Sequence, residues 1–254
     1  MTANNQINDD LNALLNVSND HLLHLNPSKS TVLLFCSENL RNNLLNSINL
    51  KICSDIILFK ESTKNLGLTV DTRLKFKEDV TLCLKKGFSM LKMIYSHRHC
   101  LSKETKTELC DSLVMSHCNF SDNVYGPFLD SVDTRRIQKL QNSCIRLICG
   151  ISRGQRVSYK LHELGWLNMF STCVFHSLAL YYKIIKFQSP PYLYNKLKFR
   201  TDVHSLNVRR KHILAIPSHT KELFKKSFSY NIAHLINKYE IRDFSLSVAS
   251  VKHQ

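Results

Sequence analysis

The chain has 254 residues, 43% of them hydrophobic, which is long enough to bury a core and too apolar for a disordered protein. Its formal net charge is +15, no stretch approaches 18 uncharged apolar residues, and the polar start MTANNQINDD lacks the apolar segment of a secretory signal. We therefore expect a nuclear or cytoplasmic protein, neither secreted nor transmembrane, with its nine cysteines reduced.

The first part of the chain is predicted to form one helix followed by short strands. Leucines at three- and four-residue steps predict an amphipathic helix over 7–25, which ends at Asn26-Pro27. Three apolar runs bounded by polar residues are too short for helices, so each predicts a strand: residues 30–36, 55–60 and 66–70. Together they indicate a small antiparallel sheet.

From Leu74 onward the hydrophobic period becomes that of helices, and the low content of Gly and Pro agrees with long ones. The first predicted helix buries Phe76, Val80, Leu84, Phe88, Leu91 and Tyr95. Ser102 is placed to cap the next helix, Gly126-Pro127 interrupts the pattern, and Gly150 follows a third helix that points Arg135, Arg136, Lys139 and Arg146 outward.

The last third is predicted to contain two further helices. Residues 169–187 form an apolar helix that stops at Ser189-Pro190-Pro191, residues 192–220 are irregular and basic, and 221–239 form a last helix. The predicted fold class is thus mainly α, with a small antiparallel β-sheet near the N-terminus that makes residues 1–75 α+β.

The positive charge is concentrated in the second half. Residues 1–127 hold 14 Lys/Arg against 13 Asp/Glu, whereas residues 128–254 hold 21 against 7, a net charge of +14. Such a basic field favours polyanions, either nucleic acid or an anionic membrane surface. The alternative is a basic, soluble surface without a partner.

No local motif predicts catalysis or a metal site. Asp9-Asp10 is an adjacent acidic pair, and its polar surroundings favour a helix start, where acidic side chains interact well with the helix dipole. The cysteines and histidines include no C-x2-C pair, the chain has no phosphate-binding glycine loop, and no signature supports a Cys–His nucleophile. We assign no catalytic or metal-binding residue.

Basic clusters with interleaved aromatic residues are the stronger signal, because Lys and Arg neutralise phosphates while aromatic rings stack on bases. Solvated surface loops are the alternative for any one residue. The candidate nucleic-acid-binding residues are Arg135, Arg136, Lys139, Arg153, Arg156, Lys160, Lys198, Arg200, Arg209, Arg210 and Lys211.

Several segments, in order, resemble the reverse transcriptases of non-LTR (LINE-type, jockey-like) retrotransposons. NDHLLHLNPSKSTVLLF at 19–35 and NLGLTVDTRLKF at 65–76 are similar to the region just past the active site of those enzymes. Further segments resemble the region beyond the thumb of those enzymes: residues 110–129, 140–151, 166–167, 204–209 and 216–220. The resemblance covers nearly the whole chain.

The resemblance implies the end of a palm domain over 1–73, thumb-like helices over 74–130 and a basic helical C-terminal region over 131–254. Lys29, Leu66 and Gly67 match the family's primer-gripping hairpin. The family's aromatic-Ala-Asp-Asp turn and its further metal-binding Asp do not occur in this sequence, and after Ser227-Phe228 the family's Trp-Asn and Leu-Pro are replaced.

We therefore expect a truncated RNA-directed DNA polymerase, inactive alone, that retains binding of RNA or DNA of the template–primer type. Mg²⁺ is implied for the complete parent enzyme, and no cofactor, membrane or small-molecule substrate is expected for this chain. Two alternatives stay open: a helical interaction or structural remnant with no ligand, and a Cys–His enzyme.

Overall fold

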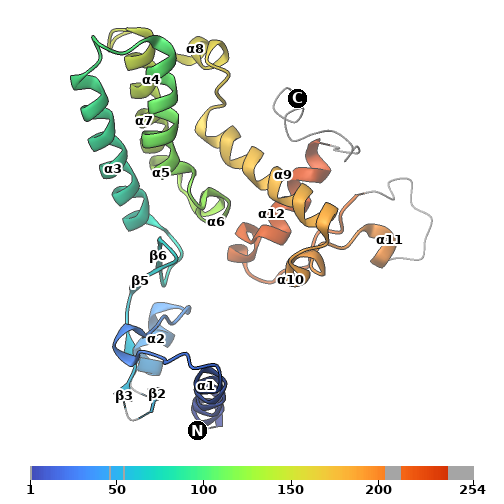
Figure 1. Ribbon diagram of the computed structural model, residues 1–254. Coiled ribbons are helices and arrows are strands. Elements are labelled where there is room, and N and C mark those ends of the chain that lie inside the picture. The colour runs from blue at the N-terminus through green and yellow to red at the C-terminus, as the bar shows by residue number, and fades with distance from the viewer. Residues whose placement is uncertain (1, 46, 54, 204–212, 240–254) are drawn as a thin grey trace. The chain divides into compact units, whose positions relative to one another are not determined.

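The computed structural model describes residues 2–45, 47–53, 55–203 and 213–239. These divide into two compact units, Met1–Asp79 and Val80–Gln254, which are considered separately. The first unit ends at Asp79, whereas the sequence predicted a boundary at residue 73, and the second unit is not divided between the regions expected at 74–130 and 131–254. Helices predominate throughout, which confirms the mainly α fold class (Figure 1).

The first unit combines two helices with six very short strands. Its helical elements are α1 (Thr2–Asp20), the 3₁₀ turn η1 (Pro27–Lys29) and α2 (Glu38–Leu45). Its strands are β1 (Thr31–Val32), β2 (Lys51–Ile52), β3 (Asp55–Ile56), β4 (Leu58–Phe59), β5 (Ser62–Asn65) and β6 (Leu68–Asp71).

The prediction of one antiparallel sheet is wrong. The strands form three separate pairs, β1–β4, β2–β3 and β5–β6, of which β1–β4 is parallel. The run predicted at 55–60 is split because Ile57 turns into the core, where its N–H donates to the Leu50 carbonyl at 3.0 Å. A small core of Leu50, Ile52 and Ile57 holds this unit together.

The hairpin β5–β6 contains two of the three residues matched to the family's hairpin. Leu66 and Gly67 are its two-residue turn, with φ of 47° and 95°, the positive values that a type I′ turn requires. Lys29 instead lies in η1, ahead of β1, so its placement in the hairpin is wrong.

Asp9-Asp10 does not mark a helix start. Helix α1 begins at Thr2, so the pair lies beyond its first turn, on the exposed side. The polar N-terminal sequence is helical because asparagines fasten it to the strand region: Asn8 both donates to the Asn49 carbonyl and accepts from the Lys51 N–H, each at 3.0 Å.

The second unit is helical. Its long helices are α3 (Lys77–Ser96), α7 (Ser131–Cys149), α9 (Met169–Phe187) and α12 (Phe228–Tyr239). The shorter ones are α4 (Lys103–Leu109), α5 (Ser116–Asn119), α6 (Asp122–Tyr125), α8 (Ser158–Glu163), α10 (Pro191–Tyr194) and α11 (Arg200–Val203). The remaining turns are the π-helix η2 (Cys110–Met115) and the 3₁₀ helices η3 (Gly126–Phe128) and η4 (Glu222–Lys226).

Helix ends in this unit follow the sequence closely. Ser102 caps α4 by accepting the Thr105 N–H, and Gly150 ends α7 with a φ of 65°, as expected. The helix predicted over 221–239 is shorter, because its first part is η4 and α12 begins at Phe228. The region expected to be irregular contains α10, α11 and a bridge between Phe199 and Leu214.

The core of the second unit has a part beneath α9 and α12, built on Tyr181, Ile184, Leu214 and Ile232. Another part lies where α3, α7 and the helical segment of α4, η2 and α5 pack side by side (Figure 1). There Cys110, Val114, Leu140, Cys144 and Ile145 are fully buried. No helix among the described residues is long and apolar enough to cross a membrane.

Candidate nucleic-acid interface

Helix α7 supplies one wall of a groove. The Asp130 carboxylate starts the helix by accepting the N–H groups of Val132 and Asp133 at 2.9 and 2.8 Å. With one face buried through Ile137 and Leu140, the helix period leaves Lys139, Ser143 and Arg146 on the outer side.

Helix α3 supplies the opposite wall, and its register differs from the predicted one. Buried positions are Val80, Leu84, Gly87, Leu91 and Ile94. Phe88 and Tyr95, predicted to be core residues, are 43% and 53% exposed, so that prediction is wrong for both. These two rings alternate with lysines at three- and four-residue steps, so the outer face of α3 carries Lys85, Phe88, Lys92 and Tyr95 in that order.

The two helices run side by side in the same direction. Arg136 Nη2 donates to Thr81 Oγ1 at 3.2 Å near their beginnings. Further along, a Cβ added at Gly87 would lie 2.6 Å from Leu140 Cδ2, so glycine permits this close approach. Beyond that contact opens a groove of about 710 Å³, lined by Phe88, Leu91, Lys92, Tyr95, Ser143, Arg146, Leu147, Ile151, Ser152 and Arg153.

The charge of this α3–α7 groove is unopposed. Lys92, Arg146 and Arg153 form no ion pair within the part of the chain that the structure describes. Two backbone carbonyls hold the Arg146 side chain in place: its guanidinium donates to the carbonyls of Asn142 and Gln155. Three cations without an acidic partner give the groove a positive potential, which favours anions.

The aromatic ring of Tyr95 carries an additional cation. The guanidinium of Arg98 lies 4.2 Å from the ring centroid and also donates to the Tyr95 carbonyl at 3.0 Å. This cation–π contact orients the ring and adds positive charge beside the groove.

Of the eight predicted binding residues that the structure describes, Arg153 lines the groove. Arg135 and Lys139 are exposed on the same side of α7 as Arg146, and Arg156 is exposed on the loop beyond Arg153. Arg209, Arg210 and Lys211 lie outside the described residues.

Two predicted cations are engaged by acids. Arg136 forms an ion pair with the buried Asp133 at 2.8 Å, so its charge is already neutralised within α7. Lys160 donates to Glu163 at 2.6 Å, and this hydrogen bond raises the pKa of its ammonium group. Lys198 and Arg200 flank the Phe199–Leu214 bridge, beside the core beneath α9 and α12 rather than in the groove.

Sequence reasoning missed Phe88, Lys92 and Tyr95, and it noted Arg146 as outward-facing without including it in the site. The signal was available on α3 as the alternation of cations and aromatics, but it was interpreted as a buried stripe. Nothing in the sequence alone places this stripe opposite α7, which begins 35 residues after α3 ends.

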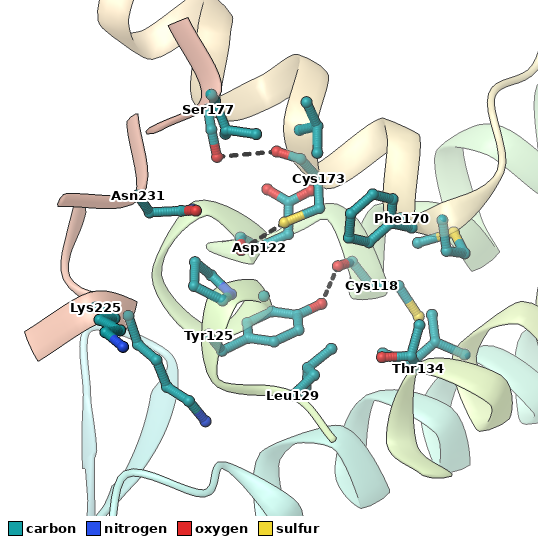
Figure 2. A pocket seen from close by; sticks show the side chains of 17 residues that line it. Cys118, Asp122, Tyr125, Leu129, Thr134, Phe170, Cys173, Ser177, Lys225 and Asn231 are labelled. Carbon is teal, nitrogen blue, oxygen red and sulfur yellow. Dashed lines mark hydrogen bonds between the residues drawn. The ribbon is translucent and has the colours of Figure 1, made fainter. Parts of the chain in front are cut away.

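A second cavity, of about 270 Å³, lies among α6, α7, α9 and α12 (Figure 2). Its wall contains Asp122, which is buried and pairs with Nδ1 of His176 at 2.6 Å. The Cys173 thiol donates to the Asp122 carbonyl at 3.3 Å, and Figure 2 shows the Tyr125 hydroxyl directed at the Cys118 carbonyl.

This cavity bears on the Cys–His alternative. Burial raises the pKa of both Cys173 and Cys118 to about 12, so neither thiol ionises near neutral pH. A nucleophilic cysteine requires a lowered pKa, and the pairing of His176 with Asp122 does not supply one. Among the described residues no three His, Cys, Asp or Glu side chains group as metal ligands.

Comparisons of the chain with protein-family models, with curated proteins and with solved structures find no match.

Proposed function

We propose that the chain corresponds to the part of a non-LTR retrotransposon reverse transcriptase that follows the catalytic turn, and that it binds RNA or DNA through the α3–α7 groove. The observation that carries the proposal is the combination of unopposed cations on both sides of the groove with exposed aromatic rings on its α3 wall. The sequence resemblance puts α3 at the start of the thumb-like helices, which hold the template–primer duplex in that family.

The role of the groove is to hold a strand, not to extend it. Phosphates are neutralised by Lys92, Arg146 and Arg153 inside the groove and by Arg135 and Lys139 along α7. The described residues do not fit the Mg²⁺ implied for the complete enzyme, because they group no set of metal ligands, so no step of the proposal involves the ion.

A salt titration tests the proposal. If these five cations each neutralise one phosphate, the logarithm of the binding constant falls with the logarithm of salt with a slope of about 3.5–4.5 in magnitude. Replacing Lys92 and Arg153 by Gln removes two contacts and lowers the slope by about 1.4–1.8. Lys183→Gln, at an exposed position on α9, is the matched control and leaves the slope unchanged.

A flat salt response, or a slope that is equally reduced by Lys183→Gln, contradicts the proposal. That result would favour the alternative of a helical interaction or structural remnant whose charge has no nucleic-acid partner.

A further inference from the structure

The aromatic residues of the groove distinguish between kinds of nucleic acid. Phe88 and Tyr95 are seven residues apart on α3, which separates them by about 10 Å along the helix axis. That distance matches three nucleotides stacked at about 3.4 Å each. Lys85 and Lys92 repeat at the same interval, so cations and rings advance together along the helix.

We infer that the α3–α7 groove selects single-stranded nucleic acid, with bases stacked on Phe88 and Tyr95 and the backbone contacted by Lys92, Arg146 and Arg153. The inference rests on the proposed function and narrows the ligand from the template–primer that the resemblance implies to its single-stranded part. Base faces are free in a single strand and covered by neighbouring bases in a duplex, so an exposed ring gains stacking from a single strand alone.

The surroundings of the two rings agree with this role. Both belong to the groove lining, and each is about half exposed, although the neighbouring buried positions of α3 show that the helix can bury apolar side chains. Contacts with phosphates require cations, whereas stacking on unpaired bases requires exposed rings, and the groove has both. The contact of Arg98 with Tyr95 covers part of one ring face and holds it ready for a base on the other.

The experiment compares two fluorescein-labelled probes by anisotropy: an oligothymidine of about 15 nucleotides and a hairpin duplex with the same number of phosphates. We expect the full chain to bind the single strand at least tenfold more tightly at equal salt. Phe88→Leu and Tyr95→Leu each weaken single-strand binding about tenfold, since one base–aromatic stack is lost. Neither variant changes the salt slope or duplex binding, because no charge is removed.

Phe187→Leu is the matched control, because Phe187 is an exposed ring at the end of α9, outside the groove lining, and it leaves both affinities unchanged. Cross-linking with an oligonucleotide carrying 5-iodouridine tests the unaltered protein, and the adducts are expected at Phe88 and Tyr95.

The outcomes separate the two proposals. The single-strand inference is overturned if both probes bind with equal affinity and neither Leu variant has an effect. If the salt slope still depends on Lys92 and Arg153 in that case, the proposed function stands. Absence of binding to either probe at low salt overturns both.

Discussion

Replacement of Gly87 by Ala tests the contact that sets the separation of α3 and α7. The added Cβ would lie 2.6 Å from Leu140 Cδ2 and 3.6 Å from Val114 Cγ1. Both neighbours are fully buried, so the clash has to be relieved by a movement inside the core. Overpacking of this kind costs about 1–3 kcal/mol, while the better helix propensity of Ala returns about 1 kcal/mol. We expect a net loss of stability of about 1 kcal/mol.

Urea denaturation followed by far-ultraviolet circular dichroism measures this change. The matched control is Gly154→Ala, because Gly154 is exposed and its added Cβ meets nothing within 4 Å. We expect the control to change stability by less than about 0.5 kcal/mol.

A double-mutant cycle isolates the clash. Leu140→Ala alone costs about 2–5 kcal/mol, because it leaves a cavity at a fully buried position. In that background Gly87→Ala becomes stabilising, because its Cβ no longer meets the Leu side chain and helix propensity decides the sign. If Gly87→Ala stabilises the unaltered chain as strongly as it stabilises Leu140→Ala, the helices are not in this contact and the groove does not have the described walls.

Three further predictions concern other parts of the molecule. Asp122→Asn removes the charged partner of His176 and lowers the free energy of unfolding by about 1–3 kcal/mol in denaturant titration; an unchanged midpoint contradicts the buried pair. Burial raises the pKa of Cys173 from 9.0 to about 12, so the folded protein holds this proton more tightly and loses stability as the pH rises from 9 to 12. For the same reason iodoacetamide is expected to modify Cys173 far more slowly than the exposed Cys53, and equal rates contradict this. Amide exchange at residues 31–35 is expected to be orders of magnitude faster than in α7, because β1 and β4 pair over two residues each; strong protection there speaks against it.

The sequence predicted the long helices well, because their buried faces, caps and stops are local. Helix α7 carries both its apolar period and its terminal Gly150, and α9 stops before its prolines. Strand pairing was not predictable, because runs of two to four residues do not specify a partner. The polar strand β5 is stabilised by its pairing with β6, and its sequence has no apolar pattern that would predict a strand.

The site was missed for a physical reason. Glycine adds nothing to a hydrophobic pattern, so the buried position of Gly87 was invisible and the stripe was assigned to Phe88 instead. The same one-residue displacement exchanged Ile94 for Tyr95. Predicted cations were grouped by nearness in sequence, whereas the groove combines α3 with the end of α7.

Lysine footprinting locates the interface most directly. The full chain is acetylated with and without the oligothymidine probe, and modification at each lysine is quantified by mass spectrometry. The account predicts that the probe protects Lys92 in the α3–α7 groove and leaves the exposed Lys183 on α9 equally reactive. Unchanged modification of Lys92 in the presence of bound probe, or equal protection of both lysines, contradicts it.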